Sequence, residues 1–135
     1  MRILIVEDDF ISRKVLEKQM SAYGEVDVTV NGKEAVEAVR IQLAQSEPYS
    51  LICLDIMMPE MDGQEALRAI RNAEKEAGIV GLDRAKIIMT TALNDSKDIL
   101  SSFRDECDGY LVKPIKKQDI KKLFDMLEIT PESAP

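Results

Sequence analysis

The chain has 135 residues, of which 45% are hydrophobic and 32% are charged, and its formal net charge is -7. This length allows one domain with a full hydrophobic core but no second folded unit, and no apolar stretch approaches the ~20 residues that a membrane span needs. The acidic balance argues against direct binding to nucleic acid, and the absence of histidine excludes an imidazole base, metal ligand or phosphocarrier. Because the apolar segment in residues 1–6 is too short for a signal peptide, we expect a cytoplasmic protein.

Strand and helix patterns alternate along the whole chain. Apolar runs and alternating residues predict strands at residues 2–6, 25–30, 51–55, 87–89 and 110–112. Apolar residues at helical spacing predict helices that include residues 11–20, 36–43, 67–77, 99–103 and 120–127. Five such units need parallel crossovers, so we expect a doubly wound α/β fold whose five-stranded sheet has the common order 2-1-3-4-5. We assign residues 1–129 to this domain and residues 130–135 to a short polar tail.

Charged side chains stand where three of these strands end. Asp55 closes the apolar run of its strand, Glu7 and Asp8 follow the first strand, and Lys113 follows the last one. Because the C-terminal ends of parallel strands share one edge of the sheet, we expect the three acids and the lysine to meet there. A structural core has no need of such a polar cluster, which therefore indicates a binding or reaction site.

The composition of this cluster suggests its chemistry. Three carboxylates within a few ångströms repel one another unless a cation lies among them. Oxygen ligands without histidine or cysteine favour a hard ion, and Mg²⁺ fits best, with Mn²⁺ as a substitute. A lysine beside such a metal can hold a phosphoryl oxygen, and a carboxylate can accept the phosphoryl group as an aspartyl phosphate, which makes Asp55 the candidate nucleophile.

Four motifs carry a resemblance to a known family. They read Ile-Leu-Ile-Val-Glu-Asp-Asp at residues 3–9, Leu-Asp-Ile-Met-Met-Pro-Glu-Met-Asp-Gly at residues 54–63, Ile-Ile-Met-Thr-Thr-Ala at residues 87–92 and Gly-Tyr-Leu-Val-Lys-Pro at residues 109–114. In this order and spacing, the sequence resembles the response regulator receiver domain, the CheY-like family of two-component signalling, over about residues 2–127. The resemblance implies a flavodoxin-like (βα)5 fold and a phosphorylation-dependent switch that catalyses only its own phosphorylation and dephosphorylation.

The resemblance also implies how the acidic end of the site works. Asp55 becomes the phosphoacceptor, and the metal is held by Glu7, Asp8, Asp55 and the backbone carbonyl of Met57. Two positions flank the phosphoryl site, Met57 and Leu93, and in the family such positions tune dephosphorylation. Since both side chains are apolar, we expect them to crowd the attacking water and slow self-dephosphorylation.

On the other side of the site, the resemblance implies that Lys113 binds phosphate, Thr91 is the hydroxyl that follows the phosphoryl group and Tyr110 is the rotating aromatic switch. The peptide bond before Pro114 is expected to be cis. Thr90 competes with Thr91 for the hydroxyl role. The family's hydroxyl precedes a small residue, which favours Thr91 and leaves Thr90 as a core-side strand residue.

The three consecutive acids offer two registers for the acidic pair. We choose Glu7 and Asp8 because the family's pair directly follows the strand and its arginine comes five residues after the second acid, as Arg13 does here. Asp9 then becomes a helix-capping or surface residue.

Partners follow from the same resemblance. The phosphoryl group would come from a phosphohistidine on a histidine kinase or a histidine phosphotransfer domain, and a downstream protein would bind the face between the fourth and fifth helices. Because the chain ends soon after the last predicted helix, we expect a stand-alone receiver, monomeric or weakly dimeric on phosphorylation. We expect no contact with membrane or nucleic acid.

Two competing functions use related chemistry. A Mg²⁺-dependent phosphatase of the haloacid dehalogenase type also has an aspartyl nucleophile at a strand tip, but it needs a second aspartate two residues later, where this chain has Met57. A flavodoxin-type electron carrier needs a phosphate loop rich in Ser, Thr and Gly after the first strand, where this chain has the acids Glu7, Asp8 and Asp9.

Overall fold

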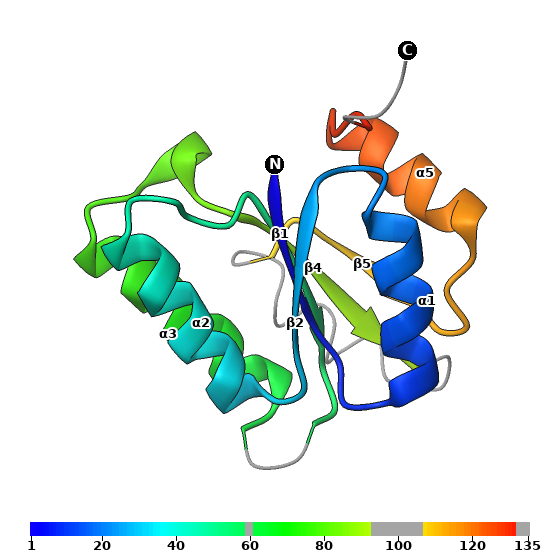
Figure 1. Ribbon diagram of the computed structural model, residues 1–135, viewed down its shortest axis with the longest axis horizontal. Helices are drawn as coiled ribbons and strands as arrows, with labels where there is room; N and C mark the ends of the chain where they lie inside the picture. The colour runs from blue at the N-terminus through cyan, green and yellow to red at the C-terminus, as the bar shows by residue number, and fades with distance from the viewer. Residues whose placement is uncertain (59–60, 93–106, 132–135) are drawn as a thin grey trace.

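The computed structural model describes residues 1–58, 61–92 and 107–131. Five parallel strands form one sheet in the order β2-β1-β3-β4-β5, as the alternation of patterns predicted (Figure 1). Their bounds are Arg2–Val6 for β1, Glu25–Thr29 for β2, Leu51–Asp55 for β3, Lys86–Thr91 for β4 and Gly109–Val112 for β5.

The helices within the described ranges are α1 (Phe10–Met20), α2 (Gly32–Ala44), α3 (Gly63–Glu76), the short 3-10 helix η1 (Gly81–Asp83) and α5 (Lys117–Met126). The first three begin at side-chain caps, which satisfy backbone N–H groups that have no partner inside the helix. The helix predicted around residues 99–103 lies outside the described residues, as does the face that it would form with α5. None of the helices in the described ranges combines the length and the apolar surface that a bilayer crossing requires.

The sheet is covered on both faces, so its three inner strands, β1, β3 and β4, are buried on both sides. Helices α2 and α3 lie on one face, and α1 and α5 lie on the other (Figure 1). Alternate residues of the central strand supply the two cores: Ile52 and Leu54 pack toward α2 and α3, whereas Leu51 and Cys53 pack toward α1 and α5. Burial on both faces explains why this strand is a continuous apolar run that only Asp55 interrupts.

The register of the sheet fixes what meets at its C-terminal edge. Val6 of β1 pairs with Leu54 of β3, so that Glu7 follows β1 at the level of Asp55. Asp55 pairs in turn with Thr90 of β4. Strands β1 and β3 are neighbours although helices and a strand separate them in sequence, and the acids at their ends are thereby brought together.

Candidate functional site

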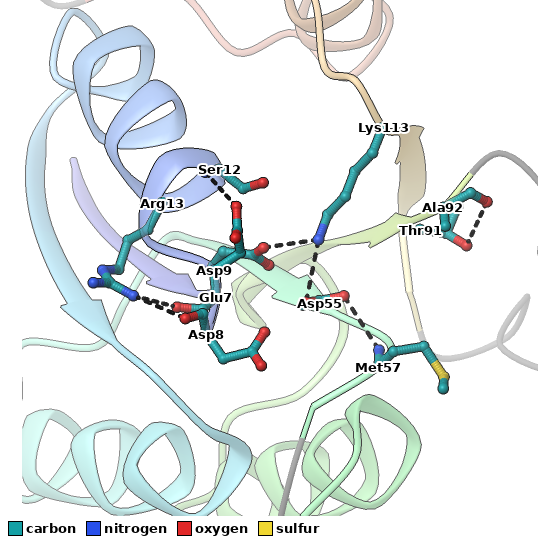
Figure 2. Close-up of polar contacts among 10 residues, drawn as sticks. All are labelled: Glu7, Asp8, Asp9, Ser12, Arg13, Asp55, Met57, Thr91, Ala92 and Lys113. Atoms are coloured by element: carbon teal, nitrogen blue, oxygen red, sulfur yellow. Dashed lines mark hydrogen bonds and ion pairs between the residues drawn. The ribbon is translucent and has the colours of Figure 1, made fainter.

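The three predicted acids form one cluster at the C-terminal edge of the sheet. Glu7, Asp8 and Asp55 each offer a carboxylate oxygen, and these oxygens all lie within 4.8 Å of one another (Figure 2). Glu7 and Asp55 are buried, with 0% and 4% of their surface exposed, whereas Asp8 is exposed. The cluster therefore has two buried carboxylates and one carboxylate that is open to solvent.

The chain after β1 is held so that two of its three acids face the site. Arg13 Nη1 donates hydrogen bonds to the backbone carbonyls of Glu7 (3.0 Å) and Asp8 (3.4 Å). Asp9 is the N-cap of α1, and its carboxylate accepts from the backbone N–H of Ser12 at 2.9 Å. That bond lowers the pKa of Asp9 and turns its carboxylate toward the helix. The capping role expected for Asp9 is thus confirmed.

Lys113 enters the cluster from the opposite side. Its Nζ lies 2.7 Å from Glu7 Oε1 and 3.3 Å from Asp55 Oδ2 (Figure 2). The peptide bond between Lys113 and Pro114 is cis. The other carboxylate oxygen of Asp55, Oδ1, accepts from the backbone N–H of Met57 at 3.2 Å. Asp55 is therefore oriented by one charged and one backbone donor.

The electrostatics of the cluster follow from its burial. Burial raises the pKa of Glu7 to about 7, and the neighbouring Asp55 carboxylate adds to this rise while Lys113 opposes it. Burial by itself would lower the pKa of Lys113, but the hydrogen bond to Glu7 and the charges of both carboxylates outweigh it and raise that pKa. Lys113 thus stays charged at neutral pH, while Glu7 is poised to exchange a proton.

The remaining predicted residues differ in how far they are exposed to solvent. Thr91 is 2% exposed, and its hydroxyl donates a hydrogen bond to the carbonyl of Ala92 at 3.4 Å; neither residue reaches Lys113 in Figure 2. Met57 and Tyr110 are 66% and 53% exposed. Leu93 lies outside the described residues.

Gly63, the last residue of the motif at residues 54–63, supports the site from the loop after β3. A Cβ atom on Gly63 would lie 2.5 Å from the backbone oxygen of Asp55 and 2.7 Å from Ile56 Cα. The Gly63 N–H donates to the carbonyl of Ile56 at 2.9 Å, which closes the loop after β3. Only glycine leaves room for this approach, which the motif at residues 54–63 contained but did not explain.

Comparison with known families decides the assignment. The family described as response regulator receiver domain matches residues 3–125, nearly the whole chain. The chain belongs to this family. Members are signalling switches of two-component systems, and the match favours a receiver over a haloacid dehalogenase-type phosphatase.

Two relatives in sequence are much longer proteins. Histidine kinase CKI1 of Arabidopsis thaliana is 43% identical over 127 residues, which cover 86% of this chain and 11% of that kinase. Hybrid signal transduction histidine kinase L of Dictyostelium discoideum is 37% identical over 124 residues, which cover 91% of this chain and 7% of that kinase. The receiver thus spans a small part of each relative.

Solved structures agree with the fold. The receiver domain of CKI1 in complex with Mg²⁺ and BeF3⁻ superposes with a TM-score of 0.76 at 33% identity, covering 92% of this chain and 89% of that one. Chemotaxis protein CheY4 of Vibrio cholerae superposes with a TM-score of 0.71 at 23% identity, covering 96% of this chain and 98% of that one, and supports the fold alone.

Proposed function

We propose that this receiver is a phosphoacceptor switch of a two-component or phosphorelay system, with Asp55 as the acceptor. The observation that carries the proposal is the position of Asp55, buried at the tip of a central strand between two further acids and the ammonium of Lys113. Core packing does not require a carboxylate with two acids and an ammonium around it. An acceptor of a phosphoryl group does, because it needs both a metal site and a cation for the phosphoryl oxygens.

The residues of the cluster fit Mg²⁺. Glu7 Oε2 is buried and has no hydrogen-bond partner among the described residues, although a carboxylate oxygen at 0% exposure normally finds one. All three side chains would bind through oxygen, which suits Mg²⁺. Asp8 is open to solvent, so the ion could keep several of its waters. Glu7, Asp8 and Asp55, with the backbone carbonyl of Met57, would hold the metal, and Mn²⁺ could replace it. Bound Mg²⁺ would supply positive charge that offsets both the carboxylates and the phosphoryl oxygens.

Asp55 and Lys113 have different roles in the transfer of the phosphoryl group. A carboxylate oxygen of Asp55 attacks the phosphorus of a phosphohistidine on the partner kinase or phosphotransfer domain. A P–O bond forms as the P–N bond breaks, and the departing imidazole nitrogen takes a proton from solvent. Lys113, which contacts the Asp55 carboxylate in the unphosphorylated protein, then pairs with a phosphoryl oxygen instead. Attack of water on phosphorus later restores the Asp55 carboxylate and releases inorganic phosphate.

The added charge is the signal. A phosphoryl group brings about -1.5 to -2 charges, which would draw the hydroxyl of Thr91 and the ammonium of Lys113 inward. Tyr110, on β5, would rotate in response, and a downstream protein would bind the face between the fourth helix and α5. The apolar side chains at Met57 and Leu93 lead us to propose slow self-dephosphorylation.

One experiment separates this switch from the phosphatase alternative. The protein is incubated with acetyl phosphate, with Mg²⁺ in one sample and EDTA in the other, and both intact mass and released phosphate are followed. A switch should gain one phosphoryl group per chain in the Mg²⁺ sample alone. Repeated turnover with no stable adduct would support a phosphatase and contradict the proposal.

Asp8→Asn should lower the affinity for Mg²⁺ by at least ~tenfold, because it removes the charge of the exposed ligand while leaving its shape. Titration calorimetry on the unphosphorylated protein measures this effect. Asp9→Asn is the matched control, since it removes the same charge one residue later and asparagine also caps helices. If Asp8→Asn and Asp9→Asn both lost affinity, the acidic pair would be the second and third acids, Asp8 and Asp9.

The affinity for Mg²⁺ should also depend on pH. The pKa of Glu7 is about 7, so this carboxyl is mostly protonated below that pH, and the metal must displace its proton. We expect the affinity to fall by up to about tenfold for each pH unit below about 7. The folded pKa lies above the ordinary glutamate value, so without metal Glu7 contributes stability at low pH that is lost as the pH rises through about 7.

Calorimetric titrations with Mg²⁺ at about pH 6 and about pH 8 measure how the affinity for the metal depends on pH. Thermal melts at the same two values should show a larger stabilisation by Mg²⁺ at the higher pH. Glu7→Gln cannot ionise and should flatten the pH dependence. Equal affinities of the wild type at both values would exclude Glu7 as the titrating ligand.

A further inference from the structure

Thr90 carries a buried hydroxyl without a partner. The residue is 1% exposed, and its Oγ1 has no hydrogen-bond partner among the described residues. Such a hydroxyl has given up its bonds to water without replacement, which is unfavourable. A valine would fill nearly the same volume without this cost. The hydroxyl therefore needs an explanation other than packing.

The register of the sheet places this hydroxyl beside the phosphoacceptor. Thr90 of β4 pairs with Asp55 of β3, and side chains of paired residues in neighbouring strands point to the same face. That face is the one covered by α1 and α5, because Cys53 and Ile88, each two residues earlier in its strand, belong to the core on that side. Thr91, one residue later in β4, points to the opposite face.

Lys113 must pass this position to reach the acids. Thr90 pairs on its other side with Leu111 of β5, and Lys113 follows Leu111 by two residues. Figure 2 shows the lysine extending from the end of β5 toward Asp55 and Glu7. Since β4 lies between β5 and β3, the side chain crosses the C-terminal end of β4, whose last two residues are Thr90 and Thr91. Its ammonium has three protons, and the contacts with Glu7 and Asp55 employ two of them.

We propose that Thr90 is a positioning residue whose hydroxyl accepts a hydrogen bond from the Lys113 ammonium when Lys113 holds a phosphoryl oxygen on Asp55. The proposal rests on the proposed function. In the unphosphorylated protein the ammonium is drawn toward Glu7, at 2.7 Å, and away from β4. Once Glu7 serves as a metal ligand, that attraction is lost and the ammonium centres on Asp55, whose neighbour is Thr90.

A neutral acceptor suits this task. A third carboxylate would compete with the phosphoryl group for Lys113, whereas a hydroxyl orients the ammonium without neutralising it. Because the hydroxyl has no partner before phosphorylation and gains one afterwards, its hydrogen bond favours the phosphorylated state. Thr90 would thus contribute to the energy difference between the two states of the switch and not to the stability of the resting fold.

Thr90→Val and Thr90→Ser test the proposal, with beryllofluoride and Mg²⁺ as the probe that stands in for the phosphoryl group. Thr90→Val should raise the melting temperature of the unliganded protein, because it removes an unpartnered buried hydroxyl, and should weaken beryllofluoride binding by about tenfold. Thr90→Ser keeps the hydroxyl and should bind within about twofold of the wild type, while its lost methyl group lowers the melting temperature. In a Lys113→Ala background, Thr90→Val should cause no further loss of binding.

The outcomes are distinct. If Thr90→Val melts higher but binds beryllofluoride as the wild type does, Thr90 is only a core residue and the proposal is overturned. If Thr90→Val fails to fold, the hydroxyl already has a structural role in the resting state, which also overturns it. If the wild type itself does not bind beryllofluoride in the presence of Mg²⁺, the proposed function fails first.

Discussion

Replacing Asp55 by asparagine should abolish phosphorylation. The amide has nearly the shape of the carboxylate but lacks the anionic oxygen that must attack phosphorus, and an acyl phosphate cannot form on it. The fold should persist, because Asn can still accept from the Met57 N–H through its carbonyl oxygen. Intact mass after incubation with acetyl phosphate and Mg²⁺ should show no adduct, whereas the wild type gains one phosphoryl group.

Asp62→Asn is the matched control for this result. Asp62 lies in the same loop after β3 and caps α3 by accepting from the Glu65 N–H at 2.9 Å. The substitution removes one negative charge near the site yet keeps a good cap, so it should be phosphorylated as the wild type is. An adduct of equal yield on Asp55→Asn would mean that another side chain is the acceptor, and peptide mapping of that adduct would identify it.

The sheet could be predicted from the sequence because strands buried on both faces leave a strong apolar signal. Ile52 to Leu54 and Ile3 to Val6 are continuous runs, and the structure places both in the sheet at the predicted bounds. The fourth strand is longer than predicted, Lys86–Thr91 against 87–89. Its last two residues are threonines, which fall outside the apolar run: Thr90, expected as a strand residue from the family resemblance, pairs with Asp55, and Thr91 pairs with Val112.

The meeting of Glu7, Asp55 and Lys113 could likewise be predicted, because the C-terminal ends of parallel strands share one edge. Contacts made by the packing of helices and loops could not. The hydrogen bonds of Arg13 to two carbonyls depend on where α1 settles against β1, and the clearance at Gly63 depends on how closely α3 approaches β3. Neither leaves a periodic signal along the chain.

A charged network at the other end of the molecule also had no sequence signal. Arg71 of α3 donates from Nη1 to Glu74 Oε1 and to the carbonyl of Ala85, both at 2.8 Å, and from Nη2 to Asp108 Oδ2 at 3.3 Å. Glu74 Oε2 accepts from the Ala85 N–H at 2.7 Å, and Asp108 Oδ2 accepts from the Ile87 N–H at 2.8 Å. The network thus joins α3 to the start of β4 and to the residue before β5.

Arg71→Met should destabilise the fold by ~3–5 kcal/mol, which is the cost of removing one partner from a buried ion pair. The side chains of Arg71 and Glu74 are only 9% and 5% exposed, so without the guanidinium the Glu74 carboxylate stays buried beside a single backbone donor. Adding Glu74→Gln should recover part of the loss, since the amide removes the unpaired charge and its carbonyl oxygen still accepts from the Ala85 N–H.

Urea unfolding followed by circular dichroism gives the free energies, and Arg68→Met is the matched control. Arg68 lies on the same helix but is exposed, so the same substitution should change stability by no more than ~0.5 kcal/mol. If Arg71→Met and Arg68→Met proved equally mild, the buried charges would contribute nothing to stability. If instead the double variant were less stable than Arg71→Met alone, the Glu74 carboxylate would be stabilised by something other than Arg71. Recovery by Glu74→Gln would show that the loss arises from an uncompensated charge and not from the missing volume of the arginine.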